Sequence, residues 1–202
     1  RSNSILGSWG LYEPAGTPMC DYFGLVAESG VKINWQQLLR TSGVPCLVFS
    51  HLDQHQIEIG LVGEQPRIGY RTRLTTGGSD CWDWFKVNDK ELARDVERRF
   101  RKLERENGPI EFEMDSSRPE EVMRTLVEWK SRQYIRTGKM GGVLLSNRYI
   151  NVLEYILKNK NASASPVLST LRCGGKLVAV HFGIRVAGVL HRWFPAYDPL
   201  FS

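Results

Sequence analysis

The chain has 202 residues, 42% of them hydrophobic and 24% charged, and its net charge is +5. These values are those of an ordinary soluble globular protein that buries one large core or two small ones. No apolar run approaches the roughly 18 residues of a membrane helix, and no signal peptide is evident, so we expect no membrane span. The mild positive charge is compatible with anionic ligands, but it is also typical of a solvated basic face, and we expect no nucleic-acid partner.

The four cysteines are widely separated, and none forms a CxxC pair or has histidines at metal-ligand spacing. They are Cys20, Cys46, Cys81 and Cys173. We therefore expect reduced thiols in a cytoplasmic protein, and no metal site. The chain begins with Arg1 rather than Met, which suggests an internal piece of a longer polypeptide.

The first part of the chain, residues 1–78, is expected to form an N-terminal lobe. The elements that we predict are a loop over 1–30, a helix over 33–41, a buried strand over 45–51 and an edge strand over 67–74. The stretch 75–80, with the sequence TTGGSD, is the best internal boundary. We expect a second domain over 79–202.

The second domain has clearer signals, beginning with the capping pattern Asn88–Glu91. The predicted elements are a helix from there to 107, a strand over 109–114, helices over 117–137 and 145–160, and strands over 167–172, 176–186 and 189–196. This order predicts an α/β (α+β) fold, with a mixed and largely antiparallel sheet flanked by helices.

The strands over 176–186 and 189–196 form a predicted hairpin, with Ala187-Gly188 as its turn. Alternation divides the first strand into two faces. The core face consists of Val178, Val180, Phe182, Ile184 and Val186; the other carries Ala179, His181, Gly183 and Arg185. The second face combines a titratable group and a cation with small residues, which leaves room for a ligand.

The register of the second strand depends on the length of the turn. A two-residue turn puts Arg192 and Phe194 on the face of His181, and puts His191 and Trp193 with Phe182. A different length would reverse both assignments, because side chains alternate with a period of two.

Three blocks of sequence support a resemblance to a known family. They are residues 96–113 (VERRFRKLERENGPIEFE), 126–138 (LVEWKSRQYIRTG) and 178–199 (VAVHFGIRVAGVLHRWFPAYDP). Together they resemble the CelD/BcsL family of GNAT-type acyltransferases, which is associated with synthesis of cellulose and other exopolysaccharides and is distantly related to Fem-like peptidyltransferases. The resemblance covers residues 80–202 closely and 18–75 loosely.

The resemblance implies transfer of an acyl group from acetyl-CoA or another acyl-CoA. The acceptor would be a hydroxyl or amine of a small molecule or saccharide, such as a precursor of cellulose or another exopolysaccharide, and no metal is implied. In the family, the strand equivalent to 189–196 leads into a loop and helix that bind the coenzyme pyrophosphate. Ser202 comes before that loop, so we expect the domain to be truncated and the 202-residue chain to be inactive.

His181 is the first candidate catalytic residue. Its ordinary pKa near neutrality suits a base that takes a proton from an attacking hydroxyl or amine. It could instead bind the acceptor, or be a core histidine bonded to the backbone. Arg185, on the same face, could bind an acidic or phosphorylated acceptor, or pair with a carboxylate at the rim.

Other candidates follow the hairpin. Tyr197 is a candidate general acid for the departing thiol, and Asp198 accompanies it; both could instead lock a corner, with Asp198 capping the next turn. The resemblance implies that backbone N–H groups of Phe194 and Ala196 meet the thioester carbonyl.

The helix over 117–137 carries a predicted acceptor-lining set. Its members are Trp129, Lys130, Gln133 and Tyr134. The alternative is a core face with a lysine that extends over it. The basic run 98–102 is interspersed with acidic residues and is best read as a solvated helix face. Two other functions stay open: Fem-like transfer from an aminoacyl-tRNA, and a non-catalytic scaffold with a GNAT-like fold.

Overall fold

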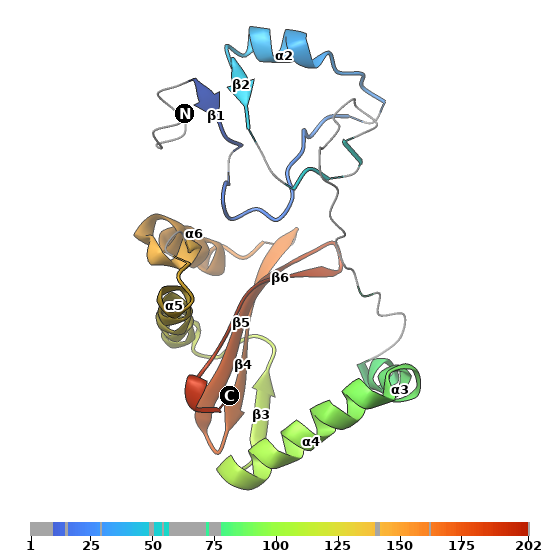
Figure 1. Ribbon diagram of the computed structural model, residues 1–202, viewed down its shortest axis with the longest axis vertical. Coiled ribbons are helices and arrows are strands. Elements are labelled where there is room, and N and C mark those ends of the chain that lie inside the picture. Colours follow the sequence, from blue (N-terminus) through green and yellow to red (C-terminus); the bar gives the residue numbers. More distant parts are fainter. Residues whose placement is uncertain are drawn as a thin grey trace. The chain divides into compact units, whose positions relative to one another are not determined.

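The computed structural model of the protein describes residues 10–14, 16–28, 30–48, 51–53, 55–56, 72, 78–139, 142–161 and 163–201. The chain divides into two compact units, Arg1–Thr72 and Arg73–Ser202 (Figure 1). Apart from Thr72, the edge strand predicted over 67–74 lies outside the described residues.

In the described residues of the first unit, the chain forms a parallel pair of short strands and a helix. These are β1 (Leu11–Tyr12), α2 (Trp35–Thr41) and β2 (Cys46–Leu47). The predicted helix is confirmed, and Asn34 caps it by accepting a hydrogen bond from the N–H of Gln37 at 3.0 Å. The predicted buried strand over 45–51 is wrong in extent and burial, because its partner β1 has only two residues and Cys46 is exposed.

The second unit is a four-stranded sheet with helices on both sides. Its elements are α3 (Gly78–Asn88), α4 (Lys90–Asn107), β3 (Ile110–Glu113), α5 (Pro119–Arg136), the 3₁₀ turn Val143–Leu145, α6 (Asn147–Lys158), β4 (Ala164–Cys173), β5 (Lys176–Val186), β6 (Val189–Tyr197) and the 3₁₀ turn Pro199–Phe201. The strand order is β3-β4-β5-β6, and every pair is antiparallel. The predicted fold class, an α/β domain with a largely antiparallel sheet, is confirmed.

The sequence analysis did not predict helix α3. It begins at Gly78, within the proposed boundary 75–80. The helix-forming segment that follows outweighs its glycine-rich start, and Lys86 pairs with Asp83 one turn away at 3.2 Å. The next helix was predicted correctly, but its cap lies one residue later than the Asn88–Glu91 pattern indicates: Asp89 accepts a hydrogen bond from the N–H of Leu92 at 3.1 Å and starts α4.

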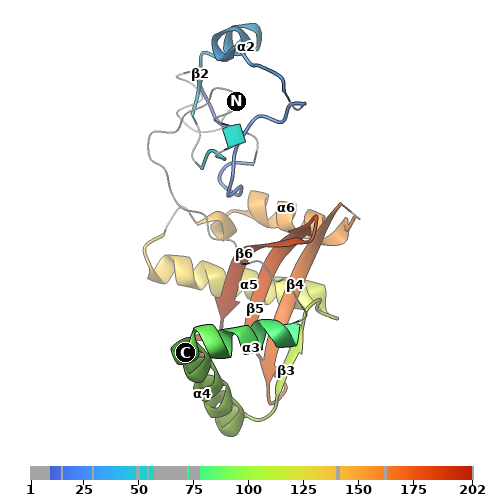
Figure 2. The ribbon, with the colours of Figure 1, turned by 90° about the vertical axis from the view of Figure 1, so that its right-hand side faces the viewer.

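The sheet lies between two helical layers, with α5 and α6 on one side and α3 and α4 on the other (Figures 1 and 2). The core fills the space between the sheet and α5/α6. Leu126 of α5, Leu153 of α6 and Phe182 of β5 are fully buried there. Their burial provides the main hydrophobic stabilisation of this unit.

The opposite sheet face carries His181 and is directed toward α4. Cys173 lies on this face, and its thiol donates hydrogen bonds to the carbonyls of Leu103, at 3.5 Å, and Gly108, at 3.0 Å. The thiol is fully buried, and it links the end of β4 to the end of α4. His181 is two residues from Gly183, which is also buried on this face.

Three predicted apolar faces extend beyond the core. The side chain of Val186, at the tip of β5, is 39% exposed because the strand projects past the helices there. Val152 of α6 is 42% exposed. The stripe of α4 is also largely open to solvent. Its exposed members are Leu92, Val96 and Phe100.

The hairpin between β5 and β6 has the predicted two-residue turn. Ala187 and Gly188 have φ values of 47° and 77°, which are those of a type I′ turn. The predicted pairings hold as far as Arg192, which faces Gly183. A bulge then inserts Trp193, so that the next residue on β6 shifts by one position relative to β5.

The bulge corrects the predicted position of Phe194. This residue pairs with Phe182 and is buried on the core face, rather than lying beside His181. Trp193 contacts both aromatic rings, with centroid distances of 6.3 Å to Phe182 and 6.1 Å to Phe194. The aromatic packing therefore accompanies the change of face.

Candidate functional site

His181 lies in the middle of the sheet face that is directed toward α4. Ser169 of β4 is its cross-strand neighbour on one side, and Pro195 of β6 is its neighbour on the other. The Nε2 atom is buried, and no residue in the described part of the chain forms a hydrogen bond with it. A buried ring nitrogen without a partner is energetically costly, so His181 stands out among the titratable groups of this face. A ligand reaches its Nε2 only when neighbouring atoms move, because this atom is closed to solvent.

The surroundings of His181 favour its neutral form. Burial lowers the pKa of its imidazole from the ordinary value of 6.5, and the positive charge of Arg192 lowers the pKa further. The imidazole is therefore uncharged at neutral pH. A neutral imidazole has a lone pair with which to accept a proton, as a general base requires.

Two arginines share this face with His181. Arg185 follows it on β5, and Arg192 of β6 lies opposite Gly183, between the two. Both guanidinium side chains are exposed. The structure thus places His181 and Arg185 on one face, as strand alternation predicted, and it adds Arg192 to the candidate site.

The predicted lining residues of α5 reach the outer edge of β6. Lys130 donates a hydrogen bond from Nζ to the carbonyl of Pro195 at 2.9 Å, and its ammonium lies 5.6 Å from the ring centroid of Tyr134. Burial, with a smaller contribution from Lys139, lowers the pKa of Lys130, and burial raises the pKa of Tyr134. Of the two groups, Lys130 is bonded directly to the strand that pairs with His181.

The other two predicted lining residues, Trp129 and Gln133, are half-exposed on α5. Within the part of the chain that the structure describes, neither side chain forms a hydrogen bond with the residues around His181. The sequence grouped all four residues by helical spacing, whereas the structure bonds Lys130 to β6 and places Tyr134 beside Lys130.

The backbone of β6 presents one N–H group to the free edge beside Lys130. Asp198 donates a hydrogen bond from its N–H to the carbonyl of Val178 at 3.0 Å. Because backbone groups alternate in direction along a strand, Ala196 and Phe194 also face β5. Their N–H groups are turned away from the edge, which does not fit the predicted contact with a thioester. Tyr197 has the N–H that faces outward.

The corner at the end of β6 is ordered by Asp198. Its Oδ1 accepts a hydrogen bond from the N–H of Leu200 at 3.0 Å, and its carbonyl accepts one from the N–H of Phe201 at 3.0 Å. These bonds are those of the predicted corner lock. The side chain of Tyr197 next to it is 47% exposed and is accessible to a ligand.

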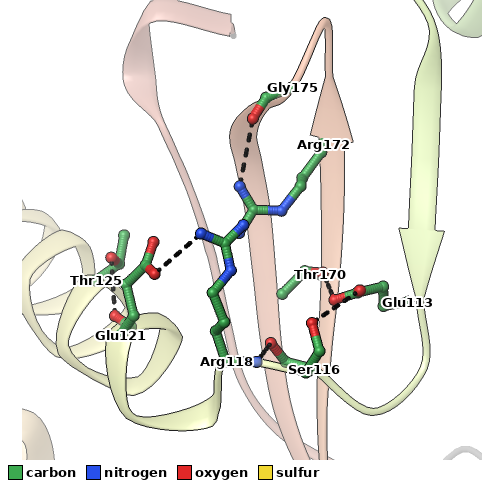
Figure 3. Close-up of polar contacts among 9 residues, drawn as sticks. Glu113, Ser116, Arg118, Glu121, Thr125, Thr170, Arg172 and Gly175 are labelled. Carbon is green, nitrogen blue, oxygen red and sulfur yellow. Dashed lines mark hydrogen bonds and ion pairs between the residues drawn. The ribbon is translucent and has the colours of Figure 1, made fainter.

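Sequence reasoning missed a polar cluster on the sheet face that lies opposite the face of His181 (Figure 3). Glu113 of β3 accepts hydrogen bonds from the hydroxyls of Thr170 at 3.3 Å and Ser117 at 3.2 Å. At the start of α5, Arg118 pairs with Glu121 at 3.3 Å. These bonds join β3, β4 and α5. No local motif indicates them, because Glu113 and Thr170 are 57 residues apart.

Two further searches bear on the site. Among the described residues, no cluster of three or more His, Cys, Asp or Glu side chains could hold a metal ion. No helix in the described ranges is both long enough and apolar enough to cross a membrane. The four cysteines are free thiols, and that of Cys173 is buried.

Comparison with known proteins identifies the family. A family model described as an acetyltransferase (GNAT) domain matches residues 90–202, from α4 to the corner after β6. No curated protein and no solved structure gave a significant match. The match covers more than half of the chain and includes His181, both arginines and the free edge of β6. The chain therefore belongs to the GNAT acetyltransferase family.

Proposed function

We propose that the protein transfers an acetyl group from acetyl-CoA to a hydroxyl or amine of a saccharide acceptor, with His181 as general base. The observation that carries this proposal is the buried, unpartnered Nε2 of an imidazole whose pKa is lowered. GNAT domains use acetyl-CoA, which supplies the acetyl group as a thioester. The cellulose- and exopolysaccharide-related acceptor rests on the resemblance to the CelD/BcsL family.

His181 would act on the acceptor. Its neutral imidazole takes the proton as the acceptor oxygen or nitrogen bonds to the thioester carbonyl carbon. The carbon–sulfur bond then breaks, and the sulfur leaves with the electron pair. The half-exposed hydroxyl of Tyr197 is the group that we assign to return a proton to it.

The free edge of β6 would bind the thioester. The N–H of Tyr197 faces outward there and could donate to the carbonyl oxygen as negative charge develops on it. Lys130 donates a hydrogen bond to the neighbouring carbonyl of Pro195, and this bond would hold the edge of β6 in position. We assign Tyr134, Gln133 and Trp129 to the acceptor side of α5.

The first test is isothermal titration of acetyl-CoA, followed by an assay of free thiol release with a panel of saccharides. The protein should carry any native residues that flank positions 1–202. His181→Gln should reduce kcat by about 100-fold or more and leave acetyl-CoA affinity unchanged. His191→Gln, in the same hairpin, is the matched control and should retain activity.

Two results would overturn this proposal. If His181→Gln lowered kcat by less than a few-fold, His181 would not be the general base. Failure of the folded wild-type protein to bind acetyl-CoA would exclude acetyl transfer and favour either aminoacyl-tRNA-dependent transfer or a scaffold role.

A further inference from the structure

The face of β5 that carries His181 has three basic side chains around one glycine. His181, Gly183 and Arg185 alternate on β5, so that neighbours on this face are about 7 Å apart. Arg192 of β6 is the cross-strand partner of Gly183, which places their Cα atoms at a distance of about 5 Å. Gly183 thus has His181 and Arg185 on either side of it along β5, and Arg192 beside it on β6.

Neither arginine in this group is neutralised by a described residue. Within the described residues, Arg185 and Arg192 form no ion pair and no side-chain hydrogen bond. Other arginines of this unit have carboxylate partners; Arg132, for example, pairs with Glu128 at 2.6 Å. The field of Arg192 reaches the imidazole, because it contributes to the lowered pKa of His181. Two uncompensated guanidinium groups favour an anion between them.

Gly183 fixes the position of the imidazole beside the arginines. A Cβ atom at this position would lie 2.9 Å from Cε1 of His181 and 3.3 Å from Cδ1 of Leu190. It would also lie 2.6 Å from the carbonyl oxygen of His191, so any side chain here would clash with both the β6 backbone and the imidazole. The absence of a side chain leaves space for the imidazole, whose buried Nε2 has no hydrogen-bond partner among the described residues.

We propose that Arg185 and Arg192 bind an anionic group of the acceptor, a carboxylate or a phosphate, and so place the accepting hydroxyl or amine at His181. This inference rests on the proposed acetyl transfer and narrows its acceptor to an acidic or phosphorylated molecule. A guanidinium fork recognises the oxygens of either anion in a bidentate manner. The anion would also compensate the charge that the protein leaves unpaired on this face.

The test compares three probes that share one sugar ring: D-glucose, D-glucuronate and D-glucose 6-phosphate. Each is titrated into the protein, and the ring-proton resonances of His181 are followed by NMR at constant ionic strength. We expect one or both anionic probes to shift the His181 signal, and glucose to leave it unchanged at the same concentration. The anionic probe that binds more tightly, D-glucuronate or D-glucose 6-phosphate, shows whether the site prefers a carboxylate or a phosphate.

Variants connect the binding to the two arginines. Arg185→Gln with Arg192→Gln should weaken the anionic probe by about tenfold or more, since each charge-assisted hydrogen bond contributes substantially. Arg136→Gln, an exposed arginine on α5, is the matched control and should keep the affinity within about twofold. Each single variant is also measured, and thermal unfolding verifies that the exposed substitutions leave the fold intact.

The outcomes separate this inference from the proposed function. Three results would each overturn the anion site. The His181 signal could shift equally with all three sugars, or it could shift with neither anionic probe. The Arg136→Gln control could also weaken binding of the anionic probe as much as the two site substitutions do. If acetyl-CoA is consumed only with neutral acceptors, the transferase stands and the inference fails. If the anions bind as expected but acetyl-CoA is not used, the anion site stands and the proposed function fails.

Discussion

Lys130 and Pro195 join helix α5 to the outer edge of the sheet. The ammonium donates a hydrogen bond to the Pro195 carbonyl across 2.9 Å, and the two residues are separated by 65 positions in the chain. Proline has no N–H, so this carbonyl is the polar backbone group that residue 195 offers to the edge. The bond therefore fixes the strand opposite His181 at the point where a substrate would approach.

Replacement of Lys130 by Met should destabilise the protein by about 1 kcal/mol, because the Pro195 carbonyl loses its charged donor while the apolar stem of residue 130 is kept. Urea unfolding measures the difference in free energy. Arg132→Met, which breaks the exposed pair with Glu128, is the matched control and should cost less than about 0.5 kcal/mol. Equal costs for the two variants would show that the contact with Pro195 contributes no more than a surface ion pair.

Gly174→Ala should be much more destabilising than Gly175→Ala. Both glycines have positive φ, 55° and 77°. A Cβ at Gly174 would lie 2.0 Å from the carbonyl oxygen of Asn107, whereas nothing lies within 4 Å of a Cβ at Gly175. We expect about 1 kcal/mol for the φ penalty alone at Gly175, and more than about 2 kcal/mol at Gly174. Similar losses in chemical denaturation would contradict this close approach of α4 to the β4–β5 turn.

The pKa of His181 should move upward in Arg192→Gln. Burial is the main cause of the lowered pKa and the Arg192 charge is the second, so removal of the charge restores only part of the shift from 6.5. NMR titration of the ring protons gives the value directly. Arg185→Gln is the control, because the lowered pKa is not attributed to Arg185. A downward or absent change in Arg192→Gln would contradict the assigned proximity.

The same pKa predicts how stability depends on pH. In the unfolded chain the imidazole of His181 takes up a proton near pH 6.5, while in the folded protein it stays neutral to a lower pH. The unfolded state thus binds more protons in this window, so stability falls as the pH decreases below 6.5. In Arg192→Gln the pKa of folded His181 is closer to that of the unfolded chain, so stability should depend on pH over a narrower pH range. Unfolding experiments between pH 5 and pH 7, which bracket the ordinary histidine pKa, would detect this difference.

Tyr197→Phe should lower kcat and leave the stability within about 0.5 kcal/mol of the wild type, because the side chain is 47% exposed. Loss of a proton donor to the sulfur typically costs about 100-fold in rate. Tyr155→Phe on α6, where the ring is 67% exposed, is the control for removal of a surface hydroxyl. An unchanged kcat would move the proton donor to another group and leave Tyr197 with its backbone N–H alone.

Local signals in the sequence were sufficient for much of the second unit. The turn at Ala187-Gly188 follows from residues that accept positive φ, and the start of α4 follows from the cap at Asp89. These features depend on a few neighbouring residues. His181 and Arg185 share a face simply because strand side chains alternate.

The features that sequence reasoning missed depend on distant partners. The bulge at Trp193 is accompanied by packing of its ring with Phe182 and Phe194, and no turn residue marks it. The bonds from Glu113 to Thr170 require the register between β3 and β4, which local patterns do not specify. Likewise, the direction of the N–H groups of Phe194 and Ala196 could not be assigned before the pairing of β6 was known.

The bulge at Trp193 divides β6 into two segments that are out of phase with each other. In the first, Arg192 points to the same side as His181; in the second, Phe194 points to the core. Deletion of Trp193 would force one segment to rotate, which would bury Arg192 or expose Phe194. If the tip of this hairpin is replaced by that of a related protein, the extra residue at position 193 should therefore be kept. Each segment of β6 then keeps its own alternation of side chains between the two sheet faces.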